Sequence, residues 1–487
     1  MSKLRRTKIL ATLGPATDAP GVLDAILAAG VDVVRLNFSH GTPGEQRARA
    51  EAVREAAARV GREVGILADL PGPKIRIEQF AEGRVQLRSG APFDLIAGAD
   101  APPGDATAVG VSYPGLPGDL APGDVLLLDD GMVQLRVERI EGERIATTVL
   151  NDGELSDRKG LNKQGGGLSL GAITDRDREL IAVAADVGVD FIAVSFCRNA
   201  GDMEEARRIA RGAGSQAALV SKIERAEAIA NLAEIIEASD VVMVARGDLG
   251  VETGDAELPG LQKKIIRESL ARNRVVITAT QMLQSMVDSP MPTRAEVLDV
   301  ANAVIDGTDA VMLSAETAAG GHPVKAVEAM ARICLGAERQ FHHDSDFEAA
   351  PRGLQRADQA IAMAAMFLSE HIDLRAIVAM TESGGTARFL SRFRSSAPVF
   401  GLSRHAPARR QMALMRSVVP LAFDSRGLDL HQATERAIAE LAGADLLAEG
   451  DRLVFTGGDH METHGATNTL RLLQVGPGAQ ATPIAAL

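Results

Sequence analysis

Three apolar runs in the middle of the chain decide its fold: DFIAVSF (190–196), ALVSKIE (218–224) and DVVMVARGDL (240–249). Each run has the length and the β-branched content of a buried strand, and the residues between the runs show helical periodicity. Strands that alternate with helices predict βα units and a parallel sheet. Because the runs are apolar almost throughout, both faces of this sheet should be covered.

The same alternation extends in both directions from these runs. Five further strands are expected, at Thr7–Leu13, Val31–Phe38, Glu63–Leu70, Val275–Gln281 and Asp309–Glu316. Eight βα units predict a closed parallel (β/α)8, or TIM, barrel built from residues 1–70 and 169–341. In such a barrel the functional groups stand at the C-terminal ends of the strands.

Residues 71–168 interrupt the barrel pattern. They are rich in Gly, Pro and short alternating runs, which predicts a small all-β domain inserted in a βα loop. Its expected strands are Val85–Leu87, Val125–Leu128, Met132–Ile140 and Ile145–Val149. An insertion at the catalytic mouth of a barrel can act as a lid.

Residues 342–487 form the last predicted unit. A polar stretch, His342–Arg356, suggests a linker, after which the strand–helix alternation resumes and predicts a C-terminal doubly wound α/β domain. The expected strands are Arg375–Met380, Pro398–Leu402, Val418–Phe423, Arg452–Phe455 and Arg471–Val475.

Composition narrows the range of functions. A formal net charge of −13, no Trp and a single Tyr argue against nucleic acid as a partner. No segment approaches the roughly 18 apolar residues of a membrane span, so no membrane association is expected. Cys197 and Cys334 lie alone in apolar stretches and suggest buried, reduced thiols. The expected location is the cytoplasm.

Polar side chains end six of the eight expected strands. They are Arg35, Asn37, Ser39 and His40 on the second strand, Asp69 on the third, Lys222 and Glu224 on the fifth, Arg246 to Asp248 on the sixth, Thr280 on the seventh, and Ser314 and Glu316 on the eighth. One such residue is ordinarily a solvated terminus or a cap. Six strand ends at one mouth predict a functional site.

The fifth and sixth strand ends suggest a metal. Glu224 and Asp248 would share an edge, and with no His or Cys beside them they suit Mg²⁺ or Mn²⁺. Lys222 points the same way as Glu224, and the plainer interpretation is a salt bridge to these acids. With Arg35, the group suits a small anion and either phosphoryl transfer or the metal-dependent enolate chemistry of a barrel lyase or aldolase acting on a keto acid.

Several motifs in order along the chain resemble the pyruvate kinase family. They are TKILATLGPA (7–16), RLNFSHG (35–41), DLPGPKIR (69–76), SKIE (221–224), ARGDLG (245–250), ATQML (279–283), PTRAE (292–296) and MLSAET (312–317). The resemblance covers nearly the whole barrel. It implies Mg²⁺-dependent phosphoryl transfer from phosphoenolpyruvate to ADP in glycolysis, giving pyruvate and ATP, by a homotetramer.

The resemblance also implies individual roles. Lys222 would stabilise the transferring phosphoryl group and the enolate, and Glu224 and Asp248 would ligate the divalent metal. The phosphoenolpyruvate contacts would be Arg35, Gly247, Asp248 and Thr280, and the nucleotide contacts Asn37, His40, Arg76 and Lys159. Ser314 and Glu316 would deliver a proton to the enolate through water. For Thr280, a plain helix-capping hydroxyl is the alternative.

The chain departs from the potassium-dependent pattern of the family. Asn37, Ser39, Asp69 and the Leu70 carbonyl resemble its monovalent-cation site, but Leu70 and Lys74 stand where that pattern resembles Thr and Glu. The Lys74 ammonium could supply the charge of K⁺, so activity without K⁺ is predicted. Alternatively, Lys74 is only a solvated residue at the rim.

The last domain resembles the regulatory domain of the family. Its loop Thr381–Thr386, with Ser383, Gly384 and Gly385, offers hydroxyls and backbone amides to a phosphate, with Arg388 nearby. A sugar monophosphate or AMP is the expected activator, because TGGD (456–459) and TNT (467–469) resemble bacterial relatives that respond to monophosphates. A helix cap without ligand, or a catalytically inactive sensor, would be the simpler outcomes.

Overall fold

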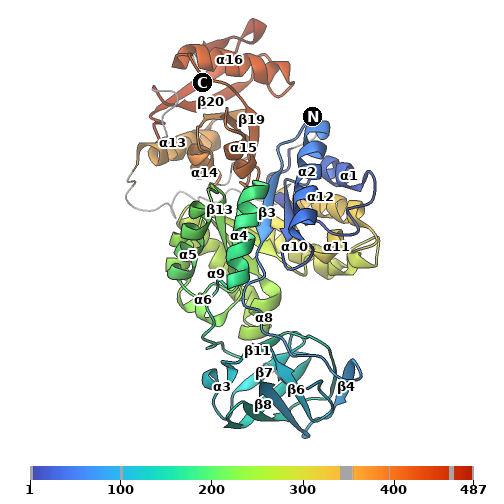
Figure 1. Cartoon of the computed structure of the whole chain (residues 1–487). Coiled ribbons are helices and arrows are strands. Elements are labelled where there is room, and N and C mark those ends of the chain that lie inside the picture. Colours follow the sequence, from blue (N-terminus) through green and yellow to red (C-terminus); the bar gives the residue numbers. More distant parts are fainter. Residues whose placement is uncertain are drawn as a thin grey trace.

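The computed structural model describes residues 4–98, 102–339, 354, 356–393, 395–459 and 465–484. The molecule has three parts in a row: the C-terminal part, the barrel and the inserted part (Figure 1). Most of the predicted linker His342–Arg356 lies outside the described residues.

The central part is the predicted closed barrel of eight parallel strands. Their order is β1-β16-β15-β14-β13-β12-β3-β2. The strands are β1 (Lys8–Thr12), β2 (Val33–Asn37), β3 (Gly65–Asp69), β12 (Phe191–Val194), β13 (Ala218–Ile223), β14 (Val241–Ala245), β15 (Val275–Ala279) and β16 (Ala310–Leu313). They are almost wholly buried, as strands covered on both faces should be.

Helices surround this barrel. They are α1 (Val22–Ala29), α2 (Pro43–Val60), α4 (Asp175–Val187), α5 (Ala200–Gly212), α6 (Ala226–Ala230), α7 (Leu232–Ala238), α8 (Arg246–Thr253), α9 (Leu258–Ala271), α10 (Arg294–Asp306), α11 (Ala315–Ala318) and α12 (Pro323–Arg339), with a 3-10 turn, η1 (Gln284–Val287). Two of the predicted strands run into helices. The run 240–249 is a strand only to Ala245, because the polar residues after it begin α8. The run 309–316 is a strand only to Leu313, because α11 begins at Ala315.

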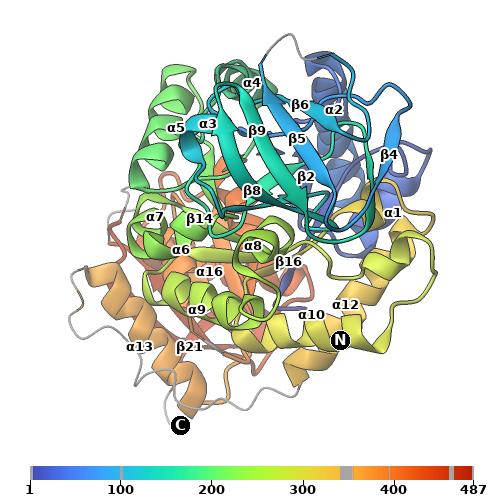
Figure 2. The same ribbon diagram turned by 90° about the horizontal axis from the view of Figure 1, so that it is seen from below.

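The inserted part is the predicted all-β unit. Its six-stranded sheet contains β5 (Pro92–Ala97), β6 (Ala108–Val111), β7 (Val125–Leu128), β8 (Val133–Glu141), β9 (Arg144–Val149) and β11 (Leu161–Lys163). A pair, β4 (Arg84–Leu87) and β10 (Gly153–Ser156), and helix α3 (Leu116–Asp119) complete it. The expected strands did not include β5, β6, β10 or β11. In β5, Pro92 and the buried Asp94 disguise the pattern. Seen from below, this unit covers the barrel mouth (Figure 2).

The C-terminal part is an α/β unit with one sheet in the order β19-β18-β17-β20-β21-β22. Its strands are β17 (Ala376–Met380), β18 (Val399–Ser403), β19 (Val418–Ala422), β20 (Arg452–Gly457), β21 (Thr469–Val475) and β22 (Ala481–Pro483). Its helices are α13 (Ala357–His371), α14 (Gly385–Leu390), α15 (Ala406–Met412) and α16 (Leu430–Gly443). The first four strands are parallel, while β21 and β22 are antiparallel.

This α/β unit closes the barrel base, opposite the mouth. One apolar cluster joins barrel-lining residues such as Leu10 and Met243 to Met412 and Leu414. Ion pairs also cross the boundary, from Arg392 to Asp309 and from Arg410 to Asp190. The mouth therefore faces the lid, and the base faces the C-terminal unit (Figure 1).

Two expectations from composition can be compared with this fold. Cys197 and Cys334 are buried free thiols, as predicted. Burial raises the pKa of Cys334 to about 12, which disfavours its thiolate. In the described part of the chain, no helix has both the length and the apolar character needed to cross a membrane.

Candidate active site

Lys222 lies at the centre of a charged cluster in the barrel mouth. Its Nζ is 2.8 Å from Glu224 Oε1 and 3.3 Å from Asp69 Oδ1, and it donates a 2.8 Å hydrogen bond to Ser195 Oγ. On the other side of Asp69, Arg35 Nε donates to Oδ2 at 2.6 Å. The third, second and fifth strand ends thus meet as predicted, and the salt bridge that the sequence left as an alternative is present.

Glu224 carries a charge that its surroundings compensate only partly. Its side chain is 1% exposed, and Oε2 accepts a 2.8 Å hydrogen bond from the Phe196 N–H. Burial raises the pKa of Glu224 to about 7; Lys222 opposes the shift, and the nearby charge of Asp248 adds to it. A carboxylate in this state favours an additional cation.

Asp248 completes the predicted carboxylate pair from the first turn of α8. Its Oδ1 is 3.2 Å from Lys74 Nζ, and 23% of its side chain is exposed. In the described residues, no three His, Cys, Asp or Glu side chains converge as a metal site. The oxygen ligands of Glu224 and Asp248 are of the kind that suits Mg²⁺ or Mn²⁺, which commonly keep water and substrate oxygens at their other positions.

Thr280 is positioned by a strained turn after β15. Thr280 and Gln281 have φ of 66° and 51°, which is the left-handed region. Arg246, 7% exposed, donates to the Thr280 carbonyl at 2.6 Å and to the Gln281 carbonyl at 3.1 Å, and its Nη1 reaches Asp299 at 2.7 Å. The Thr280 Oγ1 accepts a 2.8 Å hydrogen bond from the Gly247 N–H in the first turn of α8. Thr280 therefore caps this helix, as the alternative interpretation expected, and also lies at the barrel mouth.

Ser314 and Glu316 end the eighth strand but differ in their surroundings. Glu316 is fully buried, and its oxygens accept the Leu283 N–H at 3.1 Å and the Ser314 N–H at 2.7 Å. The Ser314 Oγ is buried and has no hydrogen-bond partner among the described residues. Of the two, Ser314 has the side-chain oxygen that the described residues leave unpaired, and Glu316 holds the turn in place.

The oxygens of the predicted monovalent site are largely engaged. Asp69 pairs with Arg35 and Lys222, and the Leu70 carbonyl accepts from Ser195 Oγ at 2.7 Å. The Asn37 Oδ1 accepts the Ser39 N–H at 3.1 Å. Lys74 is not solvated alone at the rim, since its ammonium pairs with Asp248.

The predicted nucleotide contacts come from two places. Asn37 ends β2, and the exposed His40 follows three residues later at the mouth. Arg76 and Lys159 lie on the two chain segments that join the lid to the barrel, where Arg76 pairs with Gly160 in an antiparallel bridge. Lys159 Nζ is 2.9 Å from Asp129 Oδ1, within the lid.

Three consecutive glycines lie in the lid's return to the barrel. Gly165, Gly166 and Gly167 have φ of 79°, 77° and 93°, which glycine alone adopts without cost. The Gly167 N–H donates to Glu227 at 2.6 Å, and a Cβ on Gly166 would lie 2.6 Å from the same carboxylate. The three glycines therefore allow a close approach of this segment to Glu227.

Sequence reasoning missed the functional contribution of two strand ends. Ser195, after β12, accepts from Lys222 and holds the Leu70 carbonyl. Thr12, at the end of β1, accepts from Arg35 Nη1 at 3.2 Å. Both residues are short hydroxyls at strand ends, so the same rule that selected the other six strands could have found them.

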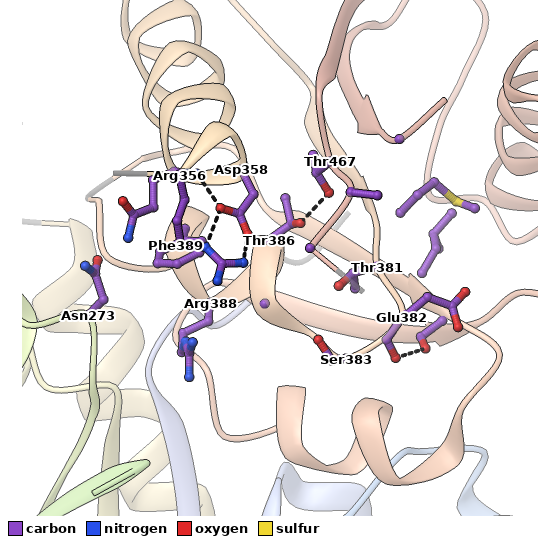
Figure 3. Close-up of a pocket in the computed structure, with 18 of the residues that line it drawn as sticks. Asn273, Arg356, Asp358, Thr381, Glu382, Ser383, Thr386, Arg388, Phe389 and Thr467 are labelled. Atoms are coloured by element: carbon purple, nitrogen blue, oxygen red, sulfur yellow. Dashed lines mark hydrogen bonds and ion pairs between the residues drawn. The ribbon is translucent and has the colours of Figure 1, made fainter. Parts of the chain in front are cut away.

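The predicted effector loop borders a cavity of about 530 Å³. Thr381, Ser383 and Thr386 line it, and Thr386 Oγ1 lies 2.8 Å from Thr467 Oγ1. Arg388 also lines it, and Gly384 lies in the loop with φ of 83°. Figure 3 shows Arg356, Arg388 and Asn273 along one side of the cavity and the hydroxyls along the other.

Fold and site together define a class: barrel enzymes that handle small anionic substrates with an ammonium, a guanidinium and a carboxylate pair. Comparison with known proteins is more specific. The family model for the pyruvate kinase barrel domain matches residues 4–327, and that for the pyruvate kinase alpha/beta domain matches residues 359–473.

Individual relatives agree with the family models. Pyruvate kinase II of Salmonella typhimurium is 52% identical over 97% of this chain and 99% of its own length. The Haemophilus influenzae pyruvate kinase is 48% identical over 97% and 99%. The crystal structure of a Cryptosporidium parvum pyruvate kinase superposes with a TM-score of 0.90 and 32% identity over 96% of both chains. The chain belongs to the pyruvate kinase family of glycolytic phosphotransferases, and this family implies phosphoenolpyruvate and ADP as substrates.

Proposed function

We propose that the chain transfers the phosphoryl group of phosphoenolpyruvate to ADP with Mg²⁺ or Mn²⁺ held by Glu224 and Asp248. The observation that supports this most is the Lys222 ammonium, 2.8 Å from Glu224 and 3.3 Å from Asp69 at the barrel mouth. It supplies a fixed positive charge where phosphoryl transfer requires charge neutralisation. A bound divalent cation would add Lewis-acid stabilisation of the phosphoryl and enolate oxygens.

The residues of the chain divide the remaining work. Arg35 binds the substrate phosphate, and Asp69 fixes the orientation of its guanidinium through the 2.6 Å hydrogen bond. The backbone of Gly247 and Asp248 and the hydroxyl of Thr280 orient the carboxylate end. Asn37, His40, Arg76 and Lys159 contact the nucleotide when the lid approaches, and Ser314 relays the proton to the enolate through water.

Activity without added K⁺ belongs to the same proposal. Lys74 carries a permanent ammonium into the mouth, where it pairs with Asp248 at 3.2 Å. This position differs from the Asp69 and Leu70 oxygens of the predicted monovalent site. The support is therefore electrostatic: the mouth already contains the cationic charge that K⁺ would add.

The C-terminal cavity supports regulation by a phosphorylated small molecule such as a sugar monophosphate or AMP. Its volume of about 530 Å³ suits such a ligand. Thr381, Ser383 and Thr386 offer hydroxyls to it. Arg388 adds a positive charge, so the site is complementary to a phosphate.

The proposed homotetramer comes from the resemblance to the family, and exposed apolar side chains on helix surfaces offer area for such contacts. Leu298 and Ile305 on α10 are 65% and 45% exposed, and their seven-residue spacing places them on one face. Phe367 on α13 is 50% exposed and stacks on His371. Light scattering should give a mass near four times 51.1 kDa. The cytoplasmic location stays a prediction from the sequence.

A coupled assay of ATP formation from phosphoenolpyruvate and ADP tests the proposal. Turnover is expected with Mg²⁺, with less than about twofold change when tetramethylammonium replaces potassium, and it should stop when a chelator removes the divalent ion. A barrel lyase would act on a keto acid without nucleotide. Ligand binding at the C-terminal unit without ATP formation would identify an inactive sensor.

A further inference from the structure

The C-terminal cavity is bounded by two parts of the molecule. Besides the effector loop, it is lined by Arg272, Asn273 and Arg274, the turn between α9 and β15 of the barrel. Asn273 turns the chain there with φ of 55°. Arg392, which follows α14, donates to the Arg274 carbonyl and ties this turn to the C-terminal unit.

Most positive charges around the cavity have a counter-charge. Arg356 makes two hydrogen bonds to Asp358, of 3.0 and 2.7 Å. Arg404 Nε lies 3.2 Å from Glu382. Arg272 pairs with Glu268. These groups need no ligand to neutralise them.

Arg274 and Arg388 are different. Arg274 donates to the Glu237 carbonyl at 2.7 Å and has no ion pair with a carboxylate among the described residues. In the same part of the chain, the Arg388 guanidinium has neither a hydrogen bond nor an ion pair, and it lies 5.6 Å from the centre of the Phe389 ring. The Nε atoms of both are buried without a partner. Two guanidiniums at one boundary thus lack an anion.

The electrostatics of Arg388 agree with this geometry. Burial and the neighbouring charges of Arg274 and Arg392 lower the pKa of Arg388. Like charges gathered in a partly buried cavity repel one another unless an anion lies between them. Arginine suits a phosphate here because its planar fork can bind two phosphate oxygens.

We propose that Arg274 of the barrel and Arg388 of α14 together bind the phosphate group of a phosphate monoester, so that the ligand of the C-terminal cavity also contacts the barrel. The inference rests on the proposed effector function and adds to it a binding residue from outside the C-terminal unit. A ligand that contacts both parts favours the relative arrangement in which the two guanidiniums converge.

Calorimetric titration of the full-length protein tests the inference. The probes are glucose 6-phosphate, ribose 5-phosphate and AMP, with glucose, ribose and adenosine as counterparts without phosphate. At least one phosphorylated probe should bind the wild-type protein. Arg388→Ala and Arg274→Ala should each weaken its binding about tenfold or more, since each removes a charge-assisted contact.

Two further variants make the result unambiguous. Arg274→Gln preserves most of the side-chain volume and should lose affinity as Arg274→Ala does, with a thermal midpoint near that of the wild type. Arg267→Ala removes an exposed positive charge from α9 outside the cavity lining, and its affinity should not change. If no phosphorylated probe binds the wild type, the effector function itself fails. If the probe binds and both Arg274 variants keep full affinity, only the barrel contact is overturned.

Discussion

The two ends of the barrel use the same chemical groups in different ways. At the mouth, Asp69, Glu224 and Asp248 share the ammonium groups of Lys222 and Lys74, and Glu224 remains under-compensated. At the base, each of four separate aspartates forms an ion pair with at least one arginine and accepts a hydrogen bond from a backbone N–H. At the mouth, the negative charge is not fully neutralised and favours a bound cation. At the base, every one of these four carboxylates is neutralised by arginines of the chain itself.

The base repeats one motif four times. Asp32, Asp190, Asp240 and Asp309 each stand directly before a barrel strand. Each accepts a 2.9 Å hydrogen bond from a backbone N–H of the neighbouring strand, donated by Ile9, Ile66, Leu219 and Val276 respectively. Each also pairs with at least one arginine. For Asp32, burial favours the neutral acid, but Arg5, Lys8 and Arg62 together hold its pKa below the usual value.

The arginines that pair with these four aspartates come from two parts of the molecule. Asp32 and Asp240 are paired by Arg5, Arg62 and Arg207 of the barrel. Asp309 is paired by Arg392, and Asp190 receives Arg410 in addition to Arg54. Two of the four repeated positions therefore attach the C-terminal unit. A buried charge thus indicates function only where its compensation is incomplete.

The strongest test of the mouth is Lys222→Met. This change removes the central positive charge while preserving much of the side-chain length. Loss of a preorganised charge at the reacting group should lower kcat about 10²- to 10³-fold or more. ATP formation in the coupled assay measures this, with the thermal midpoint as a check on folding.

Lys264→Met is the matched control, because Lys264 is an exposed lysine on α9. Its activity should match the wild type. Full activity of Lys222→Met would contradict the role of Lys222 and make the mouth resemble the base, with charges that serve only the fold.

Much of this molecule could be predicted from the sequence because of its regular pattern. Eight strand-like apolar runs separated by helical segments were enough to predict the closed barrel. The polar residues at the strand ends were enough to predict the mouth, because the C-terminal ends of barrel strands converge. The boundary at Arg246 could not be predicted, because a polar run after a strand fits an extended end as well as a first helical turn. Thr12 and Ser195 were not predicted because their neutral hydroxyls do not stand out among the other small polar residues at strand ends.

The base was beyond prediction for a different reason. The pairing of Asp309 with Arg392 joins residues 83 positions apart. Nothing in the local sequence indicates which distant arginine meets which aspartate. The same holds for Lys74, whose pairing with Asp248 depends on how the segment after β3 crosses the mouth.

The base is tested by Asp309→Asn. Asp309 is fully buried, and the change leaves the Arg392 guanidinium without its carboxylate. Breaking a buried pair in this way should lower the free energy of unfolding by about 3–5 kcal/mol. Denaturant titration measures the loss. Asp18→Asn is the control, because the Asp18–Arg49 pair is exposed and should contribute about 0–1 kcal/mol. Equal effects of the two changes would remove the distinction between docking pairs and surface pairs.

The smallest expected effect is a pH dependence of stability that comes from Glu224 at the mouth. Because the folded protein raises the pKa of Glu224 from 4.5 to about 7, it holds this proton more tightly than the unfolded chain does. The resulting stabilisation is complete below pH 4.5 and is lost as the pH rises through 7, and it amounts to at most about 3 kcal/mol.

Glu224→Gln removes the titrating group, so the difference in unfolding midpoint between wild type and variant, measured in a chelator from pH 5 to 8, isolates its contribution. The wild type should lose stability relative to the variant as the pH rises. Added Mg²⁺ should restore much of that loss in the wild type alone, since the cation favours the ionised carboxylate. Parallel profiles would mean that Glu224 is as well compensated as the aspartates of the base, and that the mouth does not require a cation.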